Sequence, residues 1–190
     1  MMSSRGSRIL IFFIVLGGLL LLISCPLRGG SKNFILYVAE FEVGPFRGTN
    51  AYKVYKSLSP FDYDKIPFST NSYQFQRNVQ EFFRKKGATS AKMNFFLKIP
   101  LVLNGPEFKR GFGSPNYFLE VKASLKSTNF SNTYNLNFAM TKKDLRRNTK
   151  PLTYSRGGFI PVNKNFLAWS TAFSKGSTFK ITLMRLEKAR

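Results

Sequence analysis

Residues 117–126 read YFLEVKASLK and residues 133–142 read TYNLNFAMTK, and apolar and polar side chains alternate along both stretches. The odd positions from Tyr117 to Leu125 are apolar, as are the even positions from Tyr134 to Met140. A period of two is the pattern of a β-strand with one buried face. The six residues between the two stretches, STNFSN, are typical turn formers. We therefore predict an antiparallel hairpin.

Four further stretches predict strands on either side of this hairpin. Residues 34–43 (FILYVAEFEV) carry one wholly apolar face, while the other face passes from Phe34 to Glu40 and Glu42 and is expected to emerge into water. Residues 92–103 are apolar at every odd position from Met93 to Leu103, and Pro100 on the opposite face indicates an edge strand or a bulge. Two more strands are expected at 166–173 and 178–187.

Residues 70–87 give the clearest helical pattern. Phe75, Val79, Phe82 and Phe83 follow one another at helical spacing and form one apolar stripe. Thr70, Asn71 and Ser72 are candidate N-caps, basic residues occupy the last turn, and Gly87 is a typical helix stop. Together these patterns predict an α+β fold: a single domain over residues 33–190, with one mainly antiparallel curved sheet and one clear helix packed on it.

An apolar run at residues 9–23 (ILIFFIVLGGLLLLI) follows two arginines and precedes Ser24 and Cys25. As a helix this run would cover roughly 22 Å, less than the roughly 30 Å hydrocarbon core of a bilayer. A basic start, a short apolar run and a small residue at its end are typical of a secretory signal peptide. We therefore expect residues 1–24 to be a signal peptide and residues 25–32 a flexible tether.

Leu22-Ile23-Ser24-Cys25 resembles the lipobox of bacterial lipoproteins. The resemblance implies cleavage before Cys25 and acylation of its thiol and its new amino group. The alternative is an uncleaved signal-anchor, in which flanking residues extend the span and Cys25 is an ordinary small apolar residue. Gly17-Gly18 within the run and Pro26 directly after the cysteine favour the lipoprotein.

The chain is strongly basic, with 30 Lys and Arg against nine Asp and Glu and a formal net charge of +21. Such a field attracts anionic partners. Anionic lipid, lipopolysaccharide and nucleic acid all fit by charge, and export argues against nucleic acid. Cys25 is the sole cysteine, so an exported domain would hold together without disulfides, which favours a bacterial cell envelope, facing the periplasm or the cell surface, over a eukaryotic secreted domain.

The sequence contains few of the residues that commonly carry out catalysis. The chain has no histidine, which excludes a Ser-His-Asp triad and histidine-ligated metals. Glu40 and Glu42 share a strand face and Asp62 and Asp64 share a loop, but we interpret these acids as solvated charges or partners of the many basic residues. We expect no enzyme activity, no cofactor and no metal; a hydrolase that uses the acids is the remaining alternative.

Residues 142–164 interrupt the strand pattern with a run of basic residues opposed by Asp144 alone. As a solvated connection, such a run would repel itself. At the rim of a sheet it could instead bind phosphate or carboxylate groups, because arginine donates two parallel hydrogen bonds to either. The candidate anion-binding residues are Lys142, Lys143, Arg146, Arg147, Lys150 and Arg156.

The mature start Cys25-Pro26-Leu27-Arg28-Gly29 is similar to the start of the lipoprotein subunit of the lipopolysaccharide-export machinery. The order of a strand, a helix ending at Lys86-Gly87, further strands and Trp169 is similar to that of a group of uncharacterised bacterial envelope lipoproteins. The leading expectation is a non-enzymatic, lipid-anchored envelope protein that binds or assembles an anionic envelope component or contacts an envelope protein. A single-pass membrane protein with an uncleaved anchor and an adaptor role is the alternative.

Overall fold

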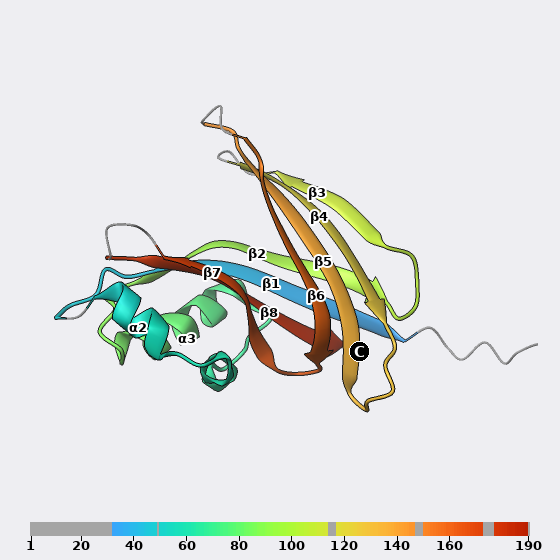
Figure 1. The fold of residues 1–190 in the computed structure, drawn as a ribbon, viewed down its shortest axis with the longest axis horizontal. Coiled ribbons are helices and arrows are strands. Elements are labelled where there is room, and N and C mark those ends of the chain that lie inside the picture. Colours follow the sequence, from blue (N-terminus) through green and yellow to red (C-terminus); the bar gives the residue numbers. More distant parts are fainter. Residues whose placement is uncertain (1–31, 49, 114–116, 147–149, 173–176, 190) are drawn as a thin grey trace, which may run out of the picture. The chain divides into compact units, whose positions relative to one another are not determined.

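The computed structural model describes residues 32–48, 50–113, 117–146, 150–172 and 177–189. These residues form two four-stranded antiparallel sheets, with helices against one of them (Figure 1). The strand orders are β2-β1-β8-β7 and β3-β4-β5-β6. The elements are β1 (Asn33–Val43), α2 (Ala51–Ser57), the 3-10 helix η1 (Pro60–Lys65), α3 (Ser72–Arg84), β2 (Ala91–Val102), β3 (Phe108–Gly113), β4 (Tyr117–Lys126), β5 (Thr133–Asp144), β6 (Leu152–Pro161), β7 (Asn165–Ala172) and β8 (Phe179–Lys188).

β1 is buried on both faces because each face packs on a different layer. Phe34, Leu36 and Val38 belong to the core between the two sheets. Phe41 and Val43 belong to a second core beneath the helices. This double burial explains the nearly continuous apolar sequence of the strand.

The predicted sheet-rich α+β class is confirmed, but the prediction of one curved sheet is wrong. After β2, the chain turns at Asn104, whose φ is +55° and whose N–H donates to the carbonyl of Leu125. It therefore crosses to the second sheet instead of extending the first. The second sheet then covers the apolar face that a single sheet would leave in water.

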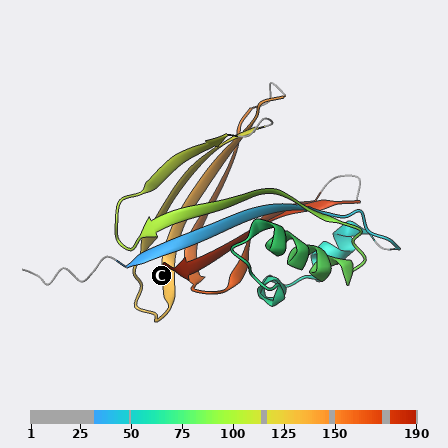
Figure 2. The same cartoon turned by 180° about the vertical axis from the view of Figure 1, so that it is seen from behind.

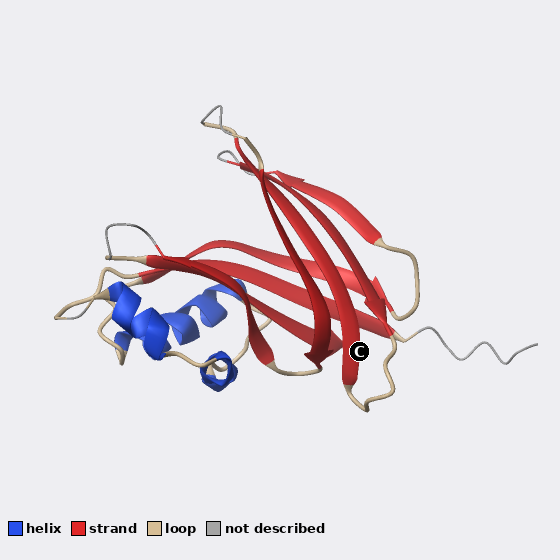
Figure 3. Ribbon diagram, in the orientation of Figure 1, coloured by secondary structure: helices blue, strands red, loops and turns tan. Residues whose placement is uncertain are grey.

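The helices cover the outer face of the first sheet (Figure 3). The predicted helix at 70–87 is confirmed as α3, with Asn71 as its N-cap: the Asn71 Oδ1 accepts the N–H of Gln74 at 3.0 Å. Phe75, Val79 and Phe83 are buried against the sheet, while Phe82 is only partly buried.

β2 lies at the edge of its sheet, where Pro100 is tolerated. Its predicted alternation fails near the start of the strand because the pairing with β1 skips Asn94. Phe95 and Leu97 face the second sheet, but Met93 packs beneath the helices. This bulge turns Lys92 toward the space between the sheets.

The predicted hairpin at 117–142 is confirmed as β4 and β5, with Val121 opposite Met140. The basic stretch that follows is not a plain connection, because β5 continues to Asp144 and residues 152–161 form β6. Alternation is hidden there because few of the side chains on β6 are buried: Ile160 is, whereas Leu152 and Phe159 are exposed.

The two sheets lie close together at the end of the folded unit that holds Asn33 and Lys188, and they separate toward the other end (Figure 1). The view from behind shows the same wedge (Figure 2). At the open end, the side chains between the sheets change from apolar to charged.

Candidate binding cleft

A cleft of about 530 Å³ lies between the open ends of the two sheets. One wall comes from the ends of β1, β2 and β8, and the other from β4, β5 and the residues after β5. We call it the cationic cleft, because four basic and two acidic side chains line it. Its lining residues are Glu42, Gly44, Pro45, Ser90, Lys92, Asn94, Tyr117, Lys142, Asp144, Arg146, Thr178 and Lys180.

Lys142 is held at the inner end of the cationic cleft by an ion pair. Its ammonium lies 2.9 Å from Oε1 of Glu40, and the side chains of the two residues are only 20% and 5% exposed. The same Glu40 oxygen accepts a hydrogen bond from Asn94 at 2.9 Å. Lys142 also lies over the ring of Tyr117, 4.9 Å from its centroid. These contacts fix the position of its charge.

The sequence predicts that Glu40 lies on a strand face that emerges into water, and this prediction is wrong. Glu40 is 4% exposed, because the second sheet covers this part of β1. Glu42, two residues farther along, does reach the cationic cleft. The interpretation of these acids as partners of basic residues is confirmed for Glu40 by its ion pair with Lys142.

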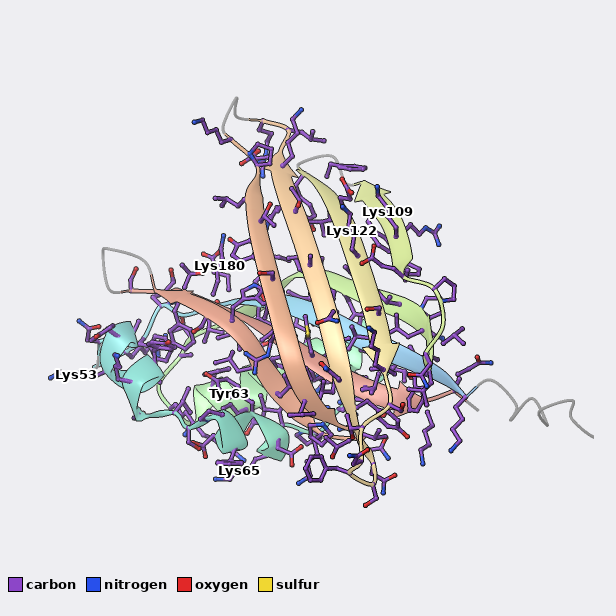
Figure 4. The ribbon with its side chains drawn as sticks, turned by 45° about the vertical axis from the view of Figure 1, so that its right-hand side comes forward. Lys53, Tyr63, Lys65, Lys109, Lys122 and Lys180 are labelled. Carbon is purple, nitrogen blue, oxygen red and sulfur yellow. The ribbon has the colours of Figure 1, made fainter. Side chains whose placement is uncertain are left out.

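Lys92 and Arg146 stand on opposite walls of the cationic cleft. Among the described residues, neither side chain has an ion-pair or hydrogen-bond partner. The backbone N–H of Arg146 donates to Oδ1 of Asp144 at 2.9 Å, which orients the start of the turn. Lys180 of β8 lies on the same wall as Lys92 and is labelled in Figure 4.

The structure brings together only part of the predicted anion-binding set. Lys142 and Arg146 line the cationic cleft, whereas Lys143, its neighbour along β5, is exposed on the other face of the strand. Lys150 is exposed just before β6. Cys25 and Arg147 lie outside the described residues.

Arg156 has a different environment from the one expected. It lies on the inner face of β6 and donates from Nη1 to the carbonyl of Ala168 on β7 at 3.0 Å. Its guanidinium also lies over the ring of Phe166, 5.6 Å from the centroid. Arg156 thus joins the two sheets and does not line the cationic cleft.

Sequence reasoning missed Lys92 and Lys180 as parts of the site. Both lie near strand ends and opposite Glu42 of β1, and only the pairing of β1 with β2 and β8 places them on one wall. The sequence carried no clear signal for Lys92, because the bulge at Asn94 is what brings it to the same side of β2 as Phe95 and Leu97.

No protein-family model matches the chain, and the comparison with curated proteins found no similar sequence. Within the described residues, no helix is long and apolar enough to cross a membrane. The described ranges also hold no group of three or more His, Cys, Asp or Glu side chains arranged to bind a metal ion.

Proposed function

We propose that this protein is a non-enzymatic, membrane-anchored envelope protein that binds the phosphate or carboxylate groups of an anionic envelope lipid or lipopolysaccharide in the cationic cleft. The observation that carries the proposal is the pair of basic side chains, Lys92 and Arg146, on opposite walls of the cleft without ion-pair partners among the described residues. An anion between the walls would supply the missing charge.

The size and charge of the cationic cleft fit such a head group. Its volume of about 530 Å³ is within the range of roughly 300–1,000 Å³ that is common for small-molecule sites. Low-dielectric sheets on both sides strengthen the attraction between a bound anion and the fixed charges. The two acids of the lining, Glu42 and Asp144, would repel a fully anionic surface and favour a ligand that also carries hydroxyl or amino groups.

The anchor is the second part of the proposal. The lipobox-like residues 22–25 and the short apolar run before them support lipidation of Cys25. Two or three acyl chains would hold the protein firmly on a membrane, whereas one chain gives only marginal binding. The lack of histidine in the chain supports a binding role over a catalytic one.

The cationic cleft is tested by a matched pair of double variants. Full-length protein in neutral detergent is titrated with lipopolysaccharide across a salt series. Lys92→Gln with Arg146→Gln should weaken binding by about ten-fold or more and flatten its salt dependence, because two charge-assisted contacts are lost. Lys109→Gln with Lys122→Gln removes the same charge from the outer face of the second sheet (Figure 4) and should have little effect. Equal losses in both variants would show a general charge effect and overturn the proposed site.

The anchor is tested by the intact mass of the protein purified from membranes. The expected species begins at a diacylated or triacylated Cys25, and Cys25→Ala should leave unprocessed precursor. A mature chain that retains residues 1–24 with a free thiol would contradict lipidation and favour the uncleaved signal-anchor.

A further inference from the structure

Two phenylalanines lie in contact with each other on the surface, far from the cationic cleft. Phe130, in the turn between β4 and β5, is 65% exposed, and Phe159 of β6 is 67% exposed. Their ring centroids are 5.9 Å apart at an interplanar angle of 86°. Single exposed apolar residues are ordinary. Two exposed rings in edge-to-face contact form a small apolar patch, and such patches mark sites that interact with protein or membrane.

The turn that carries Phe130 is held in shape by hydrogen bonds within the turn and by one from Lys188 of β8. The hydroxyl of Thr128 accepts the N–H of Phe130 at 3.1 Å and donates to the carbonyl of Thr133 at 2.6 Å. The side chain of Asn132 accepts a hydrogen bond from the ammonium of Lys188 at 3.3 Å. The exposed ring is thus presented by an ordered turn, which lowers the entropy lost on binding.

Three lysines lie at the same end of the sheets as this aromatic pair. Lys126 of β4 lies opposite Asn135, and Asn135 lies opposite Phe159, so the three residues form one row across the second sheet. Lys188 reaches the same turn from the end of β8. Lys32, where the described chain begins, accepts the N–H of Leu103 through its carbonyl and lies at this same end of the sheets. Because the chain enters the folded unit at this end, we use the name entry-end surface for the set Lys32, Lys126, Phe130, Phe159 and Lys188.

We propose that the entry-end surface rests on an anionic lipid bilayer, with Phe130 and Phe159 inserted at the boundary of head groups and acyl chains. The inference rests on the membrane attachment proposed above. If Cys25 is lipidated, the residues from Cys25 to Lys32 can span at most about 25 Å, so this end of the folded unit must stay near the bilayer. Aromatic rings bind the interface, and nearby lysines add attraction to anionic lipid head groups.

The entry-end surface and the cationic cleft lie at opposite ends of β1. The entry-end surface lies at the Asn33 end of β1, and the cationic cleft lies at its Val43 end. A strand of this length extends about 35 Å, at roughly 3.3 Å per residue. The cationic cleft therefore lies at the end of β1 that is remote from the proposed bilayer contact, and we expect its ligand to come from outside that leaflet.

The contact is tested by placing tryptophan in the surface. Full-length Phe130→Trp protein is reconstituted into vesicles of phosphatidylcholine and phosphatidylglycerol that carry bromine on the acyl chains. Bromine quenches tryptophan only at close approach, and the parent protein, with Trp169 as its single tryptophan, supplies the background. We expect the added emission of Phe130→Trp to fall by roughly one half.

The matched control is Tyr52→Trp in α2. Tyr52 is 51% exposed and contacts Tyr55, which packs on Phe179 at the opposite end of the sheets. Its added emission should be unaffected by bromine. Adding Lys126→Gln and Lys188→Gln to Phe130→Trp should reduce the quenching in anionic vesicles toward the level in pure phosphatidylcholine.

Four results would overturn the inference. Equal quenching of the two tryptophans would show a general association of the domain with lipid. A Phe130→Trp emission that is blue-shifted but independent of bromine would place the ring against protein, such as a second copy of the chain. If Phe130→Trp is not quenched in a protein whose Cys25 is lipidated, the proposed contact of the entry-end surface is wrong, but the membrane attachment is not affected. If the protein does not stay with the vesicles, the proposed membrane attachment is wrong as well.

Discussion

At the scale of single residues, Lys142 shows how burial changes the role of a charge. Its sequence position beside other basic residues suggested a free cation for ligand binding. In the structure it pairs with Glu40, and both charges are largely removed from water. Lys142 thus has a structural role at the inner end of the cationic cleft, while Lys92 and Arg146 are the cations without ion-pair partners among the described residues.

We predict that Lys142→Met destabilises the protein by about 3 kcal/mol, because it leaves the carboxylate of Glu40 buried, with Asn94 as its remaining hydrogen-bond partner among the described residues. Adding Glu40→Gln should recover a large part of that loss, because the double variant buries no unpaired charge. The free energy of unfolding in urea measures both effects. Additive losses in the double variant would mean that the two charges do not stabilise each other.

At the scale of elements, sequence periodicity predicted the β4–β5 hairpin and helix α3, because each buries one face and exposes the other. Sequence periodicity gave wrong predictions for elements that do not bury one face and expose the other. β6 was missed because its side chains are mostly exposed on both faces, and Met93 was assigned to the wrong layer because the strand pairing skips Asn94. Neither a bulge nor a solvated strand leaves a reliable period in the sequence.

Helix α3 offers a direct comparison of two adjacent phenylalanines. Phe83 is fully buried, so Phe83→Ala should cost about 3 to 5 kcal/mol of unfolding free energy through the cavity that it leaves. Phe82 is partly buried beneath Lys86, so Phe82→Ala should cost less than about 2 kcal/mol. Thermal or urea unfolding of the two variants checks the difference. Similar losses at both positions would contradict the described packing of α3 on the first sheet.

At the scale of the whole folded unit, the decisive features come from pairings between distant parts of the chain. β1 pairs with β8, and the cationic cleft draws its lining from the ends of five strands and the turns beside them. A sequence shows which residues are charged, but not which strand ends meet. For this reason the basic character of the site was predictable, whereas Lys92, Lys180 and the two-sheet architecture were not. The same geometry places the entry-end surface and the cationic cleft at opposite ends.

The central claim is that the anionic ligand lies between the two sheets, and β4 provides the most direct measurement. Tyr117 lines the cationic cleft, and its neighbour Phe118 is exposed on the outer face of the second sheet, across from Gly113 of β3. A photo-crosslinking amino acid is placed at one position or the other in the full-length protein, which is then irradiated with lipopolysaccharide. We predict a crosslinked product from position 117 and little from position 118. Crosslinking from position 118 alone, or equally from both positions, would contradict binding in the cleft.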